Sequence, residues 1–322
     1  MAIRRVEIEN FLVFQGKFEA EFCEGVNVII GGNGTGKTTL LKVMSVACDC
    51  SKSNDPYLLI DYFHNLPKAG GLFYGAIRDI SNPIDIFLAN NPDITSSQAV
   101  YGDVDKNDFV FIPNDDMLSH SKGFLALDKE RKLPFDKTYV DILAKAELPE
   151  TREIKPNAMK TIDKIKEIIG GEVLYEGDVF YVAGEDGKRI PFSLEASGYR
   201  KFGLLWKLLR NGLLEDGSIL FWDEPENSLN PEFISELVDI LLKLSSNGVQ
   251  IFITTHNELL ASYFAVSRQK ESDVMFTSLY KEDGIIKANT DSRFDLLEPN
   301  HITAEPVRLY KEKIKKGLGG DG

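Results

Sequence analysis

Residues 31–39 read GGNGTGKTT and have the residue types that bind a phosphate group. Their glycines let successive backbone N–H groups turn toward phosphate oxygens, and the spacing from Gly31 to Thr38 fits a phosphate-binding loop. Lys37 can offset β- and γ-phosphate charge, and Thr38 can offer a hydroxyl to Mg²⁺. A glycine-rich turn without a ligand is the simpler alternative. The predicted nucleotide-binding residues are Gly31, Asn33, Gly34, Thr35, Gly36, Lys37, Thr38 and Thr39.

Two acidic residues follow a run of apolar ones. Asp223 and Glu224 come directly after ILFW at 219–222. A buried strand there would deliver Asp223 to a Mg²⁺ position, and Glu224 could orient or deprotonate a water molecule. Taken alone, such a pair could equally cap a helix. We expect Thr38 and Asp223 to be metal ligands and Glu224 to be catalytic.

A histidine follows the apolar segment 249–254. Parallel sheets bind their ligands beyond the carboxyl ends of their strands, which is where His256 would lie. A lone histidine is more often structural. In this context we expect His256 to contact the γ-phosphate and to join Glu224 as a second catalytic residue.

The elements that must position these residues alternate between strand and helix. The β-branched segment 26–30 predicts a buried strand, and the pattern at 40–44 predicts a helix, so the phosphate loop joins a strand to a helix. Buried strands are also predicted at 109–112, 218–222 and 249–254. The alternation predicts an α/β fold with a mainly parallel sheet.

The rest of the chain adds further elements around that sheet. Prolines and a glycine pair indicate an irregular insertion from 51 to 101. Strands are predicted at 3–14 and 17–22, helices at 136–147, 157–169, 202–209, 231–244 and 304–316, and hairpins joining 173–182 to 188–192 and 274–280 to 284–288.

Charge and cysteine content limit the classes of partner. The 322 residues carry a net charge of −13, which repels phosphate backbones, so nucleic acid is possible only through a local patch. The short basic cluster at 311–316 is expected to be a solvated helix end. Three cysteines and four scattered histidines predict no zinc site. No apolar run approaches the length of a membrane span, so we expect a cytoplasmic chain that does not enter a membrane.

These motifs resemble those of the ABC-type ATPases. Residues 31–39, the step at 223–225, the turn at 228–230 and the ending at 254–256 look like the Walker A, Walker B, D-loop and H-loop of that family. The opening at 8–11, followed by VNVIIG, is similar to the RecF/SMC/OLD branch and its AAA-21-like bacterial relatives. The resemblance implies a P-loop ATPase fold with an antiparallel β-subdomain at the N-terminus, ATP as ligand and Mg²⁺ as cofactor.

The resemblance covers about residues 1–48 and 190–316 and so implies a divided head. We expect 1–50 to be its N-terminal part, 51–190 to be an inserted helical and irregular region with a β-hairpin, and 191–322 to be its C-terminal part. The insertion is too short and irregular for a long coiled-coil arm. Because 66 residues follow His256, we expect no nuclease domain of the kind that OLD proteins append.

The sequence departs from the family pattern at two places. Where the signature motif should have its phosphate-contacting serine stands Ala196, although Ser197 and Gly198 follow and could still face the ATP of a second copy. No glutamine follows the strand at 109–112 to serve as the Q-loop residue. Asn114 is our choice for that position, with Asp115 and Asp116 as alternatives.

The resemblance implies an ATP-driven switch in which two copies enclose two ATP molecules, as a homodimer or within a higher oligomer. Relatives of this kind look like bacterial anti-phage or toxin-regulating ATPases, so we expect a separately encoded effector, a nuclease or a toxin. A RecF-like DNA-repair clamp is an alternative that the acidic charge disfavours. A non-hydrolysing nucleotide-binding scaffold is a second alternative, which Glu224 disfavours. A transporter cassette fits the opening and signature segments worst.

Overall fold

The computed structural model describes residues 2–53, 62–63, 74–78 and 108–317, and its centre is a six-stranded sheet in the order β12-β11-β3-β10-β9-β5. Its strands are β3 (Val26–Gly31), β5 (Phe109–Ile112), β9 (Ile219–Asp223), β10 (Gln250–Thr255), β11 (Val274–Glu282) and β12 (Ile285–Asp291). Neighbouring strands run parallel, except that β12 is antiparallel to β11. The predicted mainly parallel sheet is confirmed.

A second, antiparallel sheet contains the beginning of the chain. Its order is β2-β1-β4, with β1 at Arg5–Phe11, β2 at Phe14–Glu21 and β4 at Tyr74–Arg78. The expected N-terminal β-subdomain is confirmed. The strand β4 lies inside the segment 51–101, which was expected to be irregular because of its prolines and glycines. A short strand between such residues was not predicted. The rest of that segment lies largely outside the described residues.

A third sheet corrects the hairpin expected at 173–192. It has the order β6-β7-β8, with β6 at Glu172–Glu176, β7 at Val179–Ala183 and β8 at Arg189–Pro191. The single strand expected over 173–182 is wrong, because the chain reverses at Gly177 and Asp178. Both residues have positive φ angles, 57° and 62°, as a tight two-residue hairpin turn requires.

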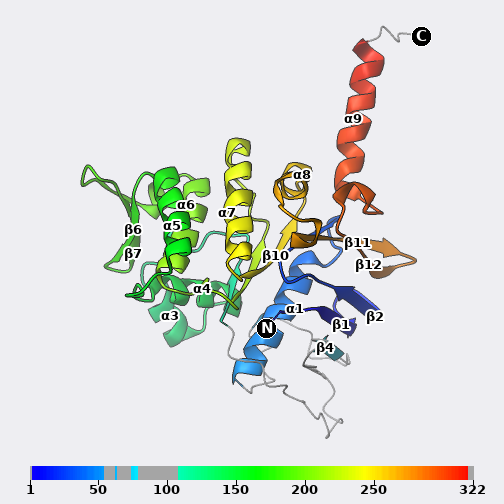
Figure 1. Ribbon diagram of the computed structural model, residues 1–322. Coiled ribbons are helices and arrows are strands. Elements are labelled where there is room, and N and C mark those ends of the chain that lie inside the picture. The colour runs from blue at the N-terminus through cyan, green and yellow to red at the C-terminus, as the bar shows by residue number, and fades with distance from the viewer. Residues whose placement is uncertain (1, 54–61, 64–73, 79–107, 318–322) are drawn as a thin grey trace, which may run out of the picture.

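Helices cover both faces of the central sheet (Figure 1). They are α1 (Lys37–Ser53), α3 (Phe124–Arg131), α4 (Lys137–Glu147), α5 (Pro156–Ile169), α6 (Ser197–Arg210), α7 (Ile234–Ser246), α8 (Glu258–Ser267) and α9 (His301–Gly317). Short 3-10 helices lie at Leu118–His120, Phe192–Leu194, Pro231–Phe233, Glu271–Asp273 and Phe294–Leu296. The sequence pattern did not predict α3 and α8: α3 is short, and α8 is apolar along most of its length and lacks a polar face.

Alternation along the strands divides the core into two layers. Ile29 and Phe252 pack with α1 and the N-terminal sheet, whereas Val28, Trp222 and Ile253 pack with the helices of the opposite face, which include α5, α6 and α7. All five side chains are fully buried. The central strands are therefore apolar along their length, and polar residues cluster where the strands end.

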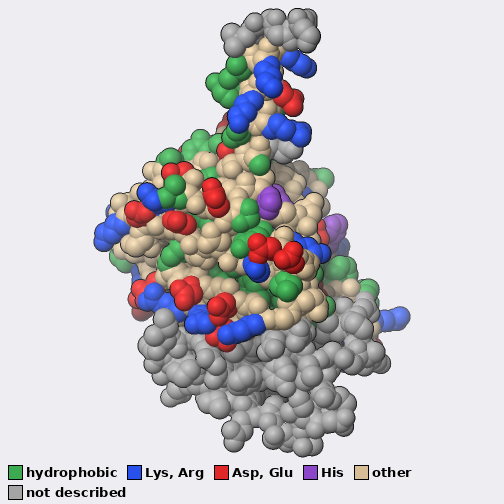
Figure 2. Space-filling view, turned by 90° about the vertical axis from the view of Figure 1, so that its right-hand side faces the viewer, with side chains coloured by type: hydrophobic (Ala, Val, Ile, Leu, Met, Phe, Trp, Pro, Cys, Tyr) green, Lys and Arg blue, Asp and Glu red, His purple; other side chains and the backbone are tan. Residues whose placement is uncertain are grey.

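The last helix, α9, stands away from the rest of the described chain (Figures 1 and 2). Most of its large apolar side chains are exposed, including Tyr310 at 65%. Lysine and arginine side chains lie along the face of this helix that Figure 2 shows, with apolar and acidic side chains among them. Among the described residues, we find no helix with the length and apolar character needed to cross a bilayer.

Candidate active site

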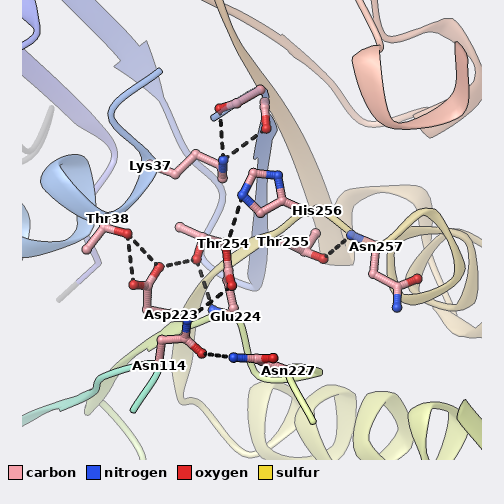
Figure 3. Close-up of polar contacts among 12 residues, drawn as sticks. Lys37, Thr38, Asn114, Asp223, Glu224, Asn227, Thr254, Thr255, His256 and Asn257 are labelled. Atoms are coloured by element: carbon pink, nitrogen blue, oxygen red, sulfur yellow. Dashed lines mark hydrogen bonds and ion pairs between the residues drawn. The ribbon is translucent and has the colours of Figure 1, made fainter. Parts of the chain in front are cut away.

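Four predicted segments meet at one edge of the central sheet (Figure 3). The loop at 31–36 follows β3, Asp223 ends β9, His256 follows β10, and Asn114 lies just after β5. Because these strands are parallel, their carboxyl ends share one edge. Residues far apart in sequence thus form one polar cluster.

The loop before α1 requires glycine at two positions. A Cβ atom on Gly31 would lie 2.5 Å from the carbonyl oxygen of Leu279, and one on Gly36 would lie 2.6 Å from Cγ2 of Val13. The φ angles of the two glycines, 157° and 89°, are positive and would strain any other residue. The glycines therefore fix the curve of the loop.

Lys37 folds back over this loop. Its Nζ donates hydrogen bonds to the carbonyl oxygens of Gly31 at 2.9 Å and Gly32 at 3.1 Å. Burial lowers the pKa of Lys37, and the nearby carboxylates of Glu224 and Asp223 oppose that shift. A phosphate group in the loop would meet a cation that is already held there.

The remaining loop residues differ in exposure. Asn33 and Gly34 are exposed at the tip, and Thr39 is half-buried in the first turn of α1. Thr35 is buried, and its hydroxyl donates to the carbonyl oxygen of Gly32 at 2.9 Å. The side chain of Thr35 therefore braces the loop from within, and the tip remains accessible.

Thr38 and Asp223 form a corner rich in oxygen atoms. Oγ1 of Thr38 lies 3.1 Å from Oδ1 and 2.8 Å from Oδ2 of Asp223. The hydroxyl of Thr254 donates to Asp223 and accepts the backbone N–H of Glu224 at 3.0 Å. Hydroxyl and carboxylate oxygens are the protein ligands that Mg²⁺ takes beside phosphate oxygens. The donor set fits Mg²⁺.

Both carboxylate oxygens of Glu224 have partners. Oε1 lies 3.0 Å from Nε2 of His256, and Oε2 accepts a hydrogen bond from Nδ2 of Asn114 at 3.2 Å (Figure 3). The φ angle of Glu224 is 47°, a conformation that costs a residue other than glycine about 1 kcal/mol or more. Strain of this kind is concentrated at functional sites.

Three residues after β5 were candidates for the Q-loop position, and the structure separates them. Asn114 contacts Glu224 and also accepts a hydrogen bond from Nδ2 of Asn227 at 2.6 Å. Asp115 accepts from the hydroxyl of Tyr139 at 3.1 Å. Asp116 pairs with Nε of Arg200 at 3.0 Å. Of the three side chains, that of Asn114 contacts the carboxylate of Glu224.

The signature-like segment begins α6. Ala196 is the N-cap residue, and its methyl side chain cannot accept a hydrogen bond. The N–H groups of the first turn of α6 therefore have no side-chain cap. The hydroxyl of Ser197 donates to the carbonyl oxygen of Ser228 at 3.0 Å. A Cβ atom on Gly198 would lie 2.9 Å from Cδ1 of Leu229. This segment therefore packs on the turn that follows Glu224 in the same chain.

Comparison with known families identifies the family of this chain. The family model described as "AAA domain, putative AbiEii toxin, Type IV TA system" matches residues 73–262, more than half of the chain. The chain belongs to this AAA family. A second model, described as an AAA domain, matches residues 5–68. The two matches include the phosphate loop, Asp223, Glu224 and His256.

Solved structures show the fold of this AAA-family protein. An SMC head bound to the winged-helix domain of ScpA aligns with a TM-score of 0.54 at 12% identity, covering 92% of this chain and 99% of that one. The SMC head domain from Thermotoga maritima aligns with a TM-score of 0.48 at 13% identity, covering 90% and 99%. The alignment with a TM-score of 0.54 shows the α/β P-loop fold of an SMC-type head.

One curated relative matches over a short segment. Over 45 residues the AAA-family chain is 51% identical to the DNA double-strand break repair Rad50 ATPase of Methanopyrus kandleri. The segment is 14% of this chain and 5% of Rad50, so the chain spans only a small part of the length of that relative.

Several residues that hold the site together were not predicted. Thr254 bridges Asp223 and Glu224, and Asn227 donates a hydrogen bond to Asn114. Lys201 donates to the backbone carbonyl oxygens of Glu224 and Pro225. The sequence could have indicated Thr254, because it is a polar residue at the end of an apolar strand. It could not have indicated Asn227 and Lys201, because their partners lie on loops that only the folded chain brings near them.

Burial controls the charge of the histidine. It lowers the pKa of His256, Lys37 adds to the effect, and Glu224 opposes it. The neutral imidazole is therefore favoured near pH 7. With its proton on Nε2, the ring donates to the carboxylate of Glu224.

Proposed function

We propose that this chain binds and hydrolyses ATP in the presence of Mg²⁺ and uses the cycle as a switch. The observation that carries the proposal is the placement of Glu224 beside the phosphate loop, with His256 at 3.0 Å from one carboxylate oxygen and Asn114 at 3.2 Å from the other. A carboxylate oriented in this way is suited to position a water molecule and take its proton.

Each residue of the cluster has a part in the proposed reaction. The N–H groups of 31–36 and the ammonium group of Lys37 would bind the β- and γ-phosphates. Thr38 and Asp223 would hold Mg²⁺, which when bound neutralises charge on the phosphate oxygens. Glu224 would direct the attacking water, and His256 would contact the γ-phosphate.

The switch would form between two copies of the chain. We propose that the first turn of α6, with Ser197 and Gly198, caps the ATP bound in the loop of the second copy. The lack of a side-chain cap at Ala196 supports this arrangement, because it leaves N–H groups at that turn that an anion can accept. Hydrolysis would then open the dimer.

The effector of the switch is proposed to be a separate protein. The description of the matching family names a toxin and a type IV toxin–antitoxin system. One SMC head of the same fold is bound to a domain of ScpA. By analogy, we propose that the closed dimer controls a separately encoded nuclease or toxin, in anti-phage defence or toxin regulation.

Phosphate release from ATP tests the proposed activity. Glu224→Gln should lower kcat about 100-fold or more, because it removes the proposed base. ATP affinity should stay close to that of the wild type. Glu185→Gln is the matched control, because its side chain is 89% exposed on a distant hairpin.

The same assay separates the proposal from its alternatives. Rapid hydrolysis by Glu224→Gln would contradict the role of that carboxylate. ATP binding without hydrolysis in the wild type would identify a nucleotide-binding scaffold.

A DNA clamp is a second candidate, and α9 is the observation that favours it. The helix has exposed lysines at 311, 313, 315 and 316 in an otherwise acidic chain. Duplex binding by the ATP-bound form that weakens steeply with salt, and that is lost when these lysines become glutamines, would support the clamp. Salt-independent or absent binding would leave the effector switch as the better account.

A further inference from the structure

Lys201 on α6 reaches the backbone of the acidic turn. Its Nζ donates hydrogen bonds to the carbonyl oxygens of Glu224 and Pro225, both at 3.1 Å. Lys201 lies one helical turn after Ser197, whose hydroxyl donates to the carbonyl oxygen of Ser228. The first two turns of α6 therefore hold both ends of the turn at 224–228.

The hydrogen bonds of Lys201 act on a strained backbone. Glu224 and Ser228, at the two ends of the turn, have positive φ angles of 47° and 59°. Such conformations persist only when surrounding contacts enforce them. The N–H of Glu224 is fixed by Thr254, and its carbonyl oxygen accepts from Lys201 and from the N–H of Asn227 at 3.0 Å. The direction of the Glu224 side chain depends on these contacts.

A buried acidic residue faces the same region. Glu226 is 9% exposed, its Oε1 accepts from Thr255, and its Oε2 has no hydrogen-bond partner among the described residues. Burial lowers the pKa of Lys201 to about 8, while Glu226, Glu224, Asp116 and Asp223 oppose the shift. The surrounding acids thus favour a lysine that carries its charge at neutral pH.

We propose that Lys201 is a positioning residue that couples α6 to the carboxylate of Glu224. The proposal rests on the proposed function, because it assumes that α6 engages the ATP of a second copy. A shift of α6 on that engagement would move the carbonyl groups of 224 and 225 through Lys201. The Glu224 carboxylate would then be placed for hydrolysis only when both copies are joined.

Replacing Lys201 tests this coupling. Lys201→Met keeps most of the side-chain volume and removes the donor, and it should lower kcat about 10- to 100-fold, the effect of a small misplacement of a catalytic group. ATP affinity should not change, nor should ATP-dependent dimerisation measured in the Glu224→Gln background. Lys201→Arg can still donate to both carbonyls and should restore kcat to within about threefold of the wild type.

Lys207→Met is the matched control on the same helix. Lys207 is 5% exposed, and its ammonium group lies 3.6 Å from Glu150, away from the acidic turn. Its loss should lower the melting temperature and leave kcat unchanged. Hydrogen exchange at the amide of Asn227 should become faster in Lys201→Met and stay unchanged in Lys207→Met.

The outcomes separate the coupling from the proposed function. Wild-type turnover by Lys201→Met, equal losses of kcat in Lys201→Met and Lys207→Met, or no recovery in Lys201→Arg would each overturn the coupling. Absence of hydrolysis by the wild type would instead overturn the proposed function. Melting curves check that each variant is folded, and Lys201→Gln replaces Lys201→Met if the latter unfolds.

Discussion

Two neighbouring threonines at the end of β10 organise the acidic turn. Thr254 donates to Asp223 and accepts from the N–H of Glu224, and Thr255 donates to Glu226. Consecutive strand residues point to opposite faces, so the two hydroxyls reach different parts of the turn. One strand end thereby fixes a metal-ligand candidate, a catalytic candidate and a buried acid.

The buried acid leads to a stability prediction. Burial raises the pKa of Glu226, so the folded state binds its proton more tightly than the unfolded state does. The stability of the wild type should therefore fall as pH rises above the ordinary range of a glutamate. Glu226→Gln removes this titration and should unfold with a free energy about 1 kcal/mol higher than the wild type at pH 8, because the amide avoids burying a negative charge.

Denaturant unfolding at a series of pH values measures that effect. The advantage of Glu226→Gln should shrink toward pH 4, where the wild-type carboxyl is largely protonated in both states. Glu185→Gln, at an exposed position, should show no such trend. A constant difference across the pH range would show that the charge of Glu226 is not the cause.

At residue scale, the spacing of the motifs in the sequence predicted which side chains lie close together in the site. It did not predict the hydrogen bonds between them. The phosphate loop, Asp223, Glu224 and His256 lie at one sheet edge as expected. Asn114 could not be separated from Asp115 and Asp116 by sequence, because the three are adjacent and polar. Their separation depends on Tyr139 and Arg200, which lie on α4 and α6.

At the scale of elements, the joint between β3 and α1 depends on the sheet packed beside it. Gly36 is the residue before α1, and its missing side chain leaves room for Val13 and Phe14 of the N-terminal sheet region. The turn between β1 and β2 therefore contacts the phosphate loop between β3 and α1. A substitution in either segment should alter the conformation of the other.

Gly36→Ala tests that joint. The new Cβ would lie 2.6 Å from Cγ2 of Val13 and 2.9 Å from Cζ of Phe14, at a φ angle of 89°. We expect a loss of about 1–3 kcal/mol in the free energy of unfolding and at least about tenfold weaker ATP binding. Calorimetric titration and denaturant unfolding measure the two effects.

Gly34→Ala is the matched control. Its φ angle is also positive, 76°, but no atom lies within 4 Å of a Cβ at that position. This variant should share the backbone strain and lack the clash, so it should lose less stability. Equal losses in both variants would mean that the contact with Val13 and Phe14 is unimportant.

Sequence patterning predicted the elements of the central sheet better than those around it. Buried parallel strands are continuous apolar runs, so β3, β5, β9 and β10 were visible. The strand β4 was not, because its partner β1 lies far away in sequence. The turn at Gly177 and Asp178 was missed because apolar residues on both sides suggested one long strand.

At the scale of the whole molecule, charge is unevenly distributed. The chain has a net charge of −13, yet α9 projects from it with lysines along its last turns. The expected solvated helix end agrees with the exposure of those side chains. The domain division at residues 50 and 190 remains a prediction, and β5, which falls in its middle part, pairs with β9 in the central sheet.

Assembly is the property of the whole molecule on which the proposed switch depends. A single copy presents the phosphate loop, while the first turn of its own α6 packs on the turn after Glu224. The capping role proposed for that turn therefore needs a second chain. Blocking hydrolysis should trap the closed state that ATP favours.

The most direct measurement is the solution mass of Glu224→Gln by light scattering, with and without Mg²⁺ and ATP. The account predicts a monomer without nucleotide and a dimer with Mg²⁺ and ATP. Lys37→Ala, which should not bind the nucleotide tightly, should remain a monomer under both conditions. A Glu224→Gln protein that binds ATP and keeps the mass of a monomer would contradict the account.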